Sequence, residues 1–434
     1  MRAAPGHSPR LVLNSTSLMA STVLTSAVGL AYWALAARLA SPGQVGTGSA
    51  LVSAATLLAG LAQLSLGMFA LRHLPTAGDR AARWVTACFM ATGATAVVLA
   101  VGYVALGLGG AFLAGGPTIA VFVVAVPVLA LFILQDSVVL GLGAAPLVPV
   151  QNLAFSLAKL ALLPALAGLA VVSGIFLSWV LTAAVAVTAV MIVIYRGLVH
   201  VPTPRREPLP PRRELGRFLA LQYVVVVTAH VAAFGMPLLV VARLGTVAAG
   251  FFALPWMIGS AFEQLNNAVL RALSVHATAA NPVTRAELAR TAGLLGLVSG
   301  VGALVLAVLA PVVLDVAAPG YAAAGTPLLR TMCLAAPFVA VWQLGRTLLW
   351  LDGRMRLLAI TDVLAVAAVL ALAWLLTPVL GLVAPGWACV IGYGTGALLS
   401  APWLVRRLRP IVAAPVPSAV AEPVTSAVHP PVGR

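Results

Sequence analysis

Charged residues are scarce in this chain. Asp, Glu, Lys and Arg make up 8% of its 434 residues, whereas apolar residues make up 62% and the mean hydropathy is +1.08. Soluble domains carry roughly a quarter charged residues, so this chain has too little polar surface to cover itself in water. The composition excludes a soluble globular protein and indicates one that is solvated by lipid.

Two chemical signatures are also missing. The three cysteines, Cys88, Cys333 and Cys389, lie inside apolar segments without the spacing of metal ligands, which argues against a metal centre or a redox function. No glycine-rich loop carries the Lys and Ser or Thr of a P-loop, so ATP hydrolysis is not expected. We therefore expect no cofactor.

Apolar stretches long enough to cross a bilayer, about 20 residues each, recur along the chain. Residues 117–134 are apolar on every face, which is typical of a helix and unlike the alternating pattern of a barrel strand. The predicted spans are residues 11–37, 45–70, 84–108, 117–141, 149–170, 174–195, 218–242, 248–270, 290–314, 326–349, 357–377 and 382–404. The expected fold class is all-α integral membrane, with about 12 transmembrane helices.

The predicted organisation has two six-helix lobes, residues 11–195 and 218–405. Residues 196–217 join them and carry six arginines, of which Arg205, Arg206, Arg212 and Arg213 lie among prolines, which is typical of a linker. Residues 1–10 form a short basic N-terminus, and residues 406–434, rich in Pro, Ala and Val, are expected to be a disordered tail.

Basic residues sort to one side of these spans. The formal net charge is +15, and all but five of the 25 Lys and Arg fall on the side of the N-terminus; the exceptions are Arg38, Arg243, Arg330, Lys159 and Arg346. Under the positive-inside rule that side is the cytoplasm. We expect both termini inside, a bacterial plasma membrane location, and no binding to nucleic acid.

Tryptophans near the predicted span ends are expected to be interfacial anchors rather than binding residues. These are Trp33, Trp84, Trp179, Trp350 and Trp403.

The two predicted lobes share a short internal repeat. Ala37-Arg38-Leu39 ends the first span, and Ala242-Arg243-Leu244 ends the seventh. A glycine follows a few residues later in each case, Gly46 and Gly250. Two parallel halves related by a two-fold axis along the membrane normal would produce this pattern.

The first copy of this repeat, continued to Leu71-Arg72 and followed by Gln135-Asp136-Ser137 and Gln151-Asn152, resembles the N-terminal half of a known family. That family is the Wzx-type oligosaccharide-lipid flippases of polysaccharide biosynthesis, in the MOP superfamily. Residues 311–321, Leu328-Leu329-Arg330 and the turn at 381–386 resemble its C-terminal half. The resemblance covers most of residues 11–405 through diffuse motifs.

The resemblance implies a flippase that moves a polyprenyl-diphosphate-linked oligosaccharide across the membrane by alternating access between the lobes. Membrane lipid and the lipid-linked glycan are the implied partners, with a proton or sodium gradient and polysaccharide-assembly enzymes as further candidates. Multidrug efflux within the same superfamily is the alternative. A membrane-embedded synthesis enzyme is disfavoured because the predicted outer loops are short and carry Asp315 as their only acid, and a non-transporting scaffold is the remaining alternative.

Charged side chains inside the spans are candidates for function, since each costs about 2.5–3.5 kcal/mol to insert. Asp136 and Lys159 lie at similar distances from a hairpin turn predicted near residue 147, and Arg346 and Asp362 lie at similar distances from one near residue 354. We expect two cross-hairpin ion pairs at matched depth, which either fix the hairpins or contact substrate.

The other candidates are polar residues within or at the ends of spans. Glu263, in a polar half-span, suits proton coupling or structural hydrogen bonding, and His230 would titrate near neutral pH or bond a neighbouring helix. Gln151 and Asn152 lie at the predicted cytoplasmic mouth, where they would serve sugar hydroxyls or join helices. Gln343 is expected to line the same cavity as Asp362.

Overall fold

The computed structural model describes residues 9–168, 172–200, 209–276 and 283–408, and these are helical apart from short connections. Most of the predicted N-terminal segment, the centre of the linker and nearly all of the tail lie outside the described residues.

The N-terminal elements begin with α1 and α2, separated by a two-residue turn. Ser41 starts α2 as a capping box: its side chain accepts from the Gln44 backbone N–H, the Gln44 side chain accepts from the Ser41 backbone N–H, and Pro42 takes the first helical position. The helices are α1 Pro9–Leu39, α2 Pro42–Ala62, α3 Leu66–His73, α4 Ala81–Ala105, α5 Gly116–Gly141, α6 Leu147–Leu166 and α7 Gly174–Arg196, with single 3₁₀ turns at η1 Leu74–Thr76, η2 Gly78–Arg80 and η3 Leu198–His200.

The second predicted span, residues 45–70, is not one continuous helix. Leu64 and Ser65 adopt left-handed backbone angles, with φ of 49° and 60°, so α2 ends at Ala62 and α3 begins at Leu66. Neither residue type favours this conformation, and no glycine marks the break. After the break α3 packs against α5, a tertiary contact that propensity alone does not reveal.

The C-terminal elements begin with α8, which contains one non-helical residue, Gly245, at φ 82°. Gly245 divides α8 into a first arm that precedes it and a second arm that follows it. The elements are α8 Arg212–His276, α9 Arg285–Gly296, the π-helical turn η4 Leu297–Gly302, α10 Ala303–Ala317, α11 Ala322–Leu351, α12 Met355–Leu380, the 3₁₀ turn η5 Gly381–Val383 and α13 Ala384–Leu408.

Within the described residues, nine helical stretches are long and apolar enough to cross a membrane. Two of them contain a break: Arg212–Arg271 turns at Gly245, and Met355–Ala401 turns at Gly381, whose φ is 56°. Leu24–Leu39 of α1 is a further, shorter apolar helix.

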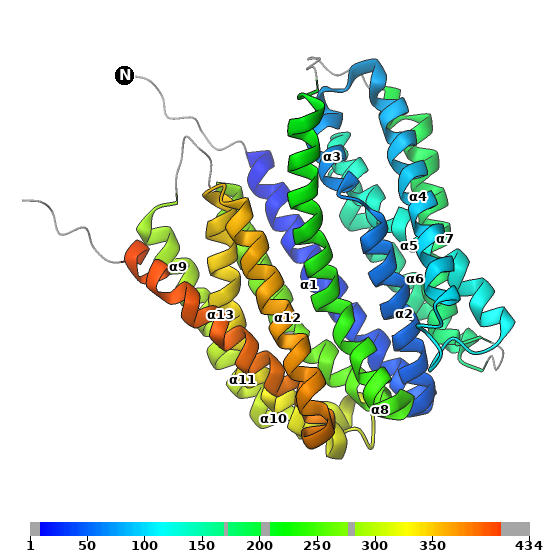
Figure 1. The fold of residues 1–434 in the computed structure, drawn as a ribbon, viewed down its shortest axis with the longest axis vertical. Coiled ribbons are helices and arrows are strands. Elements are labelled where there is room, and N and C mark those ends of the chain that lie inside the picture. Colours follow the sequence, from blue (N-terminus) through cyan, green and yellow to red (C-terminus); the bar gives the residue numbers. More distant parts are fainter. Residues whose placement is uncertain (1–8, 169–171, 201–208, 277–282, 409–434) are drawn as a thin grey trace, which may run out of the picture.

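The helices form two groups with α1 and α8 between them. Figure 1 shows α2 to α7 on one side and α9 to α13 on the other. Contacts across the middle are made mainly by α2 with α8 and by α1 with α8 and α10. The main hydrophobic core therefore includes residues of both groups, such as Leu51 of α2, Met236 of α8 and Val369 of α12.

Two glycines bring the backbones of α2 and α8 into close contact. A β-carbon added to Gly46 would overlap the carbonyl oxygen of Thr246, and one added to Gly250 would overlap that of Pro42. The two contacts are equivalent, because Gly46 and Gly250 are separated along the chain by the same number of residues as Pro42 and Thr246. We call Pro42, Gly46, Thr246 and Gly250 the glycine seam. The sequence repeat that predicted matching positions in the two lobes thus places them against each other.

The repeated arginines beside this seam have backbone partners. Arg38 donates from its guanidinium to the carbonyl oxygens of Val316 and Ala317 at the end of α10. Arg243 donates to the carbonyl of Trp374 in α12 and lies 4.1 Å from the centre of its indole ring. Cations stabilise free carbonyls of this kind, so both arginines join helices.

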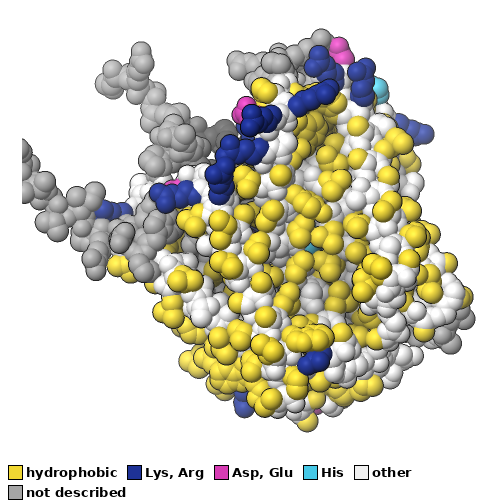
Figure 2. All heavy atoms as spheres, in the orientation of Figure 1, with side chains coloured by type: hydrophobic (Ala, Val, Ile, Leu, Met, Phe, Trp, Pro, Cys, Tyr) yellow, Lys and Arg dark blue, Asp and Glu magenta, His cyan; other side chains and the backbone are white. Residues whose placement is uncertain are grey.

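Basic and hydrophobic side chains occupy different parts of the surface. Figure 2 shows Lys and Arg side chains gathered at one end of the molecule, above a broad face of hydrophobic side chains. Arg72, Arg80, Arg212, Arg354 and Arg356 are exposed members of the basic set. An apolar belt bordered by basic residues is the arrangement expected of a membrane-spanning bundle.

Candidate functional site

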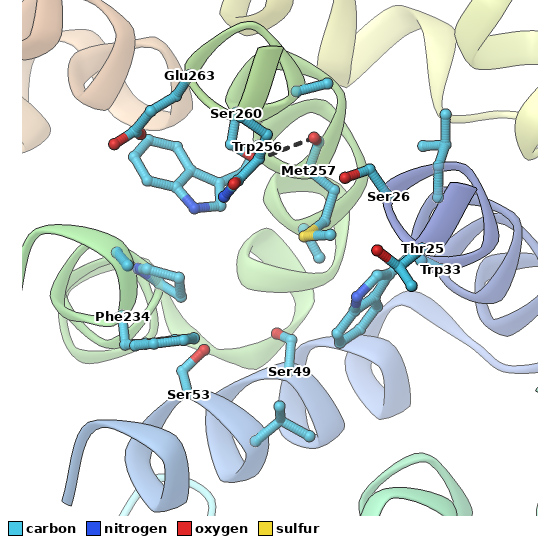
Figure 3. A pocket seen from close by; sticks show the side chains of 18 of the residues that line it. Thr25, Ser26, Trp33, Ser49, Ser53, Phe234, Trp256, Met257, Ser260 and Glu263 are labelled. Atoms are coloured by element: carbon cyan, nitrogen blue, oxygen red, sulfur yellow. Dashed lines mark hydrogen bonds between the residues drawn. The ribbon is translucent and has the colours of Figure 1, made fainter. Parts of the chain in front are cut away.

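A cavity of about 630 Å³ lies between the two groups of helices. Its walls come from α2, α6 and α7 of the N-terminal group and from α1 and both arms of α8, which lie between the groups. Figure 3 shows α1, α2 and the two arms of α8 enclosing this space. The cavity therefore lies between α1, α2, α6 and α7 on one side and α8 on the other.

Aromatic and hydroxyl side chains make up much of the lining. Trp33 of α1, Phe234 of the first arm of α8 and Trp256 of its second arm face the cavity from different helices (Figure 3). Ser49 and Ser53 line it from α2, where small residues leave room. Such a surface can contact both an apolar ligand and hydroxyl groups.

Lys159, the only lysine in the chain, lines the N-terminal wall. Its side chain is 6% exposed, and its Nζ lies 3.8 Å from the ring centre of Trp179, 4.9 Å from that of Phe155 and 5.2 Å from that of Tyr32. The three rings come from α7, α6 and α1. A cation over aromatic faces gains about 2 kcal/mol or more when it is desolvated.

The predicted ion pair between Asp136 and Lys159 is wrong. The Asp136 carboxylate accepts hydrogen bonds from the side-chain amides of Gln151 and Asn152, the latter at 3.0 Å. The turn between α5 and α6 is centred near residue 144, because α5 ends at Gly141 and α6 begins at Leu147. The prediction placed the turn three residues too late, which moved the expected partner about six residues along α6.

Gln151 and Asn152 therefore hold the α5–α6 hairpin together at Asp136, and the described structure does not place these three residues in the cavity lining. This supports the helix-joining interpretation over the sugar-binding one.

The predicted pair between Arg346 and Asp362 is confirmed. Arg346 of α11 donates from Nε and Nη2 to the two carboxylate oxygens of Asp362 of α12, both at 2.7 Å. Asp362 is 1% exposed and Arg346 25%. The Arg346 guanidinium also lies 4.6 Å from the ring centre of Trp342. A fork-to-fork pair of this kind fixes the geometry of both helices.

Glu263 connects this pair to the cavity. It is an exposed residue of the second arm of α8 and one of those that line the cavity, and Figure 3 shows its side chain beside the Trp256 ring. The Arg346 guanidinium is its electrostatic neighbour. Gln343 of α11 is 1% exposed and is a further side-chain neighbour of Glu263. Acidic groups thus extend from the cavity wall into the C-terminal group.

His230 packs in the interface between the groups. Its Nδ1 bonds the carbonyl of Val226 at 2.9 Å, one turn back on its own helix, rather than a neighbouring helix as predicted. Its ring occupies the space that a side chain at Gly60 of α2 would need. Two turns earlier on α8, the Tyr223 hydroxyl donates to the carbonyl of Leu61 at 3.1 Å.

Sequence reasoning missed the aromatic part of the site. Trp33 and Trp179 were expected at the membrane interface, but Trp33 is 6% exposed and both line the cavity. One signal was present: Phe155 and Lys159 are four residues apart and share a helical face. Trp350, by contrast, is 48% exposed, as an anchor would be.

No family model and no curated protein matches the chain. Solved structures do match its fold. A MATE transporter in complex with MaL6 is 16% identical, with a TM-score of 0.60, and the match covers 92% of this chain and 95% of that one. An inward-facing multidrug resistance MATE family transporter of the MOP superfamily is 16% identical at a TM-score of 0.60, over 91% and 94% of the two chains.

A third similar structure is a MOP superfamily transporter from Pyrococcus furiosus, described as having a binding pocket of reverse polarity that suggests a different function. It is 13% identical at a TM-score of 0.57, over 91% of this chain and 95% of that one. At these identities the likeness shows the fold: an all-helical, multi-pass membrane architecture of the kind found in MATE transporters.

Proposed function

We propose that this chain is a membrane transporter that moves a polyprenyl-diphosphate-linked oligosaccharide across the bacterial plasma membrane by alternating access between its two lobes. The observation that carries the proposal is the cavity between the lobes, with Lys159 as a cation on one wall that has no carboxylate partner among the described residues. A diphosphate supplies the missing negative charge. The resemblance of the motifs to Wzx-type flippases supports the same substrate.

Multidrug efflux is the second candidate. Glu263 and the rings of Trp33, Phe234 and Trp256 would suit an aromatic organic cation, and similar structures include multidrug resistance transporters. The Pyrococcus furiosus transporter is described with a pocket of reverse polarity, so pocket charge is the property that would separate the two functions on this fold.

The experiment is a direct comparison of the two substrates. Purified protein is reconstituted in liposomes that contain a fluorescent polyprenyl-diphosphate oligosaccharide, and the fraction reaching the other leaflet is measured with a membrane-impermeant quencher. Ethidium efflux is measured in matched vesicles. The proposal expects lipid translocation above that of protein-free vesicles and no ethidium efflux; the reverse result would establish the drug transporter instead.

The proposed topology has twelve crossings with both termini in the cytoplasm. It counts the nine apolar stretches, two more for the breaks at Gly245 and Gly381, and α1. The exposed arginines at one end then face the cytoplasm, together with the linker of residues 196–217. Alkaline phosphatase, active only outside the cytoplasm, should be inactive when fused within residues 205–217 or after Arg434. It should be active within residues 107–115; activity in the linker would reverse the orientation.

Glu263 is proposed to couple transport to a proton gradient. It is the acid among the residues that line the cavity. The Arg346 guanidinium, which is paired with Asp362, is its electrostatic neighbour, so a change in the charge of Glu263 would be felt by the C-terminal lobe. Glu263→Gln keeps the size of the side chain but fixes its charge, so translocation should lose its pH dependence. Glu214→Gln, an exposed acid at the start of α8, is the matched control and should keep it. Retained pH dependence in Glu263→Gln would return this residue to a structural role.

A further inference from the structure

The three rings around Lys159 form a cage that does not depend on the lysine. The Tyr32 hydroxyl donates to the Ile175 carbonyl at 2.9 Å and bonds the Ser178 hydroxyl at 2.7 Å, which anchors α1 to α7. Trp179 meets the Tyr32 ring edge-on at a centroid distance of 6.2 Å and the Phe155 ring at 5.8 Å. These contacts hold each ring from the protein side, so the cage would persist without its occupant.

The occupant is a single ammonium group. No carboxylate of the described chain pairs with Lys159, since the nearest predicted acid, Asp136, is bonded to Gln151 and Asn152. The faces of aromatic rings carry the negative end of the ring quadrupole. Rings arranged around one point at distances of 3.8 to 5.2 Å are how proteins bind quaternary ammonium ligands.

The cage also opens on the substrate path. Lys159 and Trp179 both line the cavity between the lobes, whereas Tyr32 is fully buried behind them. A small organic cation in the cavity would therefore reach the cage if the lysine were absent. With the lysine present, the ammonium position is filled and the wall that faces the ligand is positive.

We propose that Lys159 is a tethered ammonium that fills an aromatic cation site, Tyr32, Phe155 and Trp179, and thereby excludes organic ammonium ions from the N-terminal wall of the cavity. This one side chain sets which sign of charge the wall accepts: an anionic group docks against the lysine, and an organic ammonium binds only in its place. The inference rests on the proposed function only in taking the cavity as the substrate path.

The test is binding of choline, compared with its neutral isostere 3,3-dimethyl-1-butanol, to purified protein in detergent by saturation-transfer NMR. Lys159→Ala empties the cage and should bind choline at least tenfold more tightly than the wild type does, and at least tenfold more tightly than it binds the neutral alcohol. Lys159→Arg, which keeps a cation on a long stem, should stay without choline binding. Lys159→Ala with Trp179→Leu should lose the gain.

Equal choline binding by wild type and Lys159→Ala would overturn the proposal, as would equal binding of choline and the alcohol by the variant. Lys159→Thr serves as the second variant if Lys159→Ala is not recovered as a monodisperse protein, and the same outcomes apply to it. The assay needs no transport. A gain of choline binding in a protein that fails to move the lipid-linked oligosaccharide would uphold the cage and refute the proposed function, so the two failures are distinguishable.

Discussion

Gly46→Val and Gly250→Val are each expected to stop transport and to lower the thermal stability of the protein. At either position the first added carbon overlaps a backbone carbonyl oxygen of the other lobe, Thr246 or Pro42, and backbone cannot rotate away as a side chain can. Small residues are what allow helices to approach this closely in membranes. Overpacking costs typically about 1–3 kcal/mol, and a backbone collision lies at the upper end.

The matched control is Gly102→Val in α4, where an added β-carbon meets no atom within 4 Å. It should unfold at the wild-type temperature in detergent and transport normally. The equivalence of the two contacts adds a second expectation: Gly46→Val and Gly250→Val should have similar effects. Wild-type transport in either variant would show that the glycine seam is not a required contact between the lobes.

Breaking the Arg346–Asp362 pair is expected to have the second large effect. Asp362 is 1% exposed, so Arg346→Met leaves a buried carboxylate without its partner, at a cost of about 3–5 kcal/mol. Asp362→Leu leaves a guanidinium that is 25% exposed rather than fully buried, so its cost should be smaller. Replacing both residues removes the stranded charge and should recover most of the stability.

Thermal unfolding of the two single variants and the double variant in detergent measures this coupling. Arg354→Met, an exposed arginine at the next turn, is the control and should change little. If the double variant is as stable as the wild type but its translocation no longer responds to pH, the pair serves coupling rather than folding. Additive losses in the double variant would mean that the two residues do not interact energetically.

The two predicted ion pairs show when counting residues from a hairpin turn predicts a contact between helices and when it does not. Both came from equal distances to a hairpin turn, and the arithmetic succeeded only where the turn was placed correctly. Gly353, at φ 69°, marks the α11–α12 turn near the expected residue 354, and Arg346 meets Asp362. At the α5–α6 turn, Ala144, Ala145 and Pro146 extend the apolar pattern, so the turn was displaced and Lys159 was assigned the wrong partner.

The helical fold was accessible from composition because apolar length is a strong signal. The repeat around Gly46 and Gly250 was accessible because both positions have the same packing requirement. The aromatic cage was not, because Tyr32, Phe155 and Trp179 come together only through the packing of three helices. A tryptophan near a span end has the same local sequence whether it faces lipid headgroups or an internal cavity.

Alternating access between the two lobes requires the contact between α2 and α8 at the glycine seam to open, and a reversible cross-link tests this most directly. A β-carbon at Gly43 would lie 3.6 Å from Cγ2 of Val247, which brings a cysteine pair at these positions within reach of a disulfide. The native Cys88, Cys333 and Cys389 are buried and do not compete. In liposomes, oxidised Gly43→Cys/Val247→Cys protein should translocate no lipid-linked oligosaccharide, and reduction should restore the rate of the unoxidised variant. Translocation at the full rate by the fully cross-linked protein would contradict alternating access at this seam.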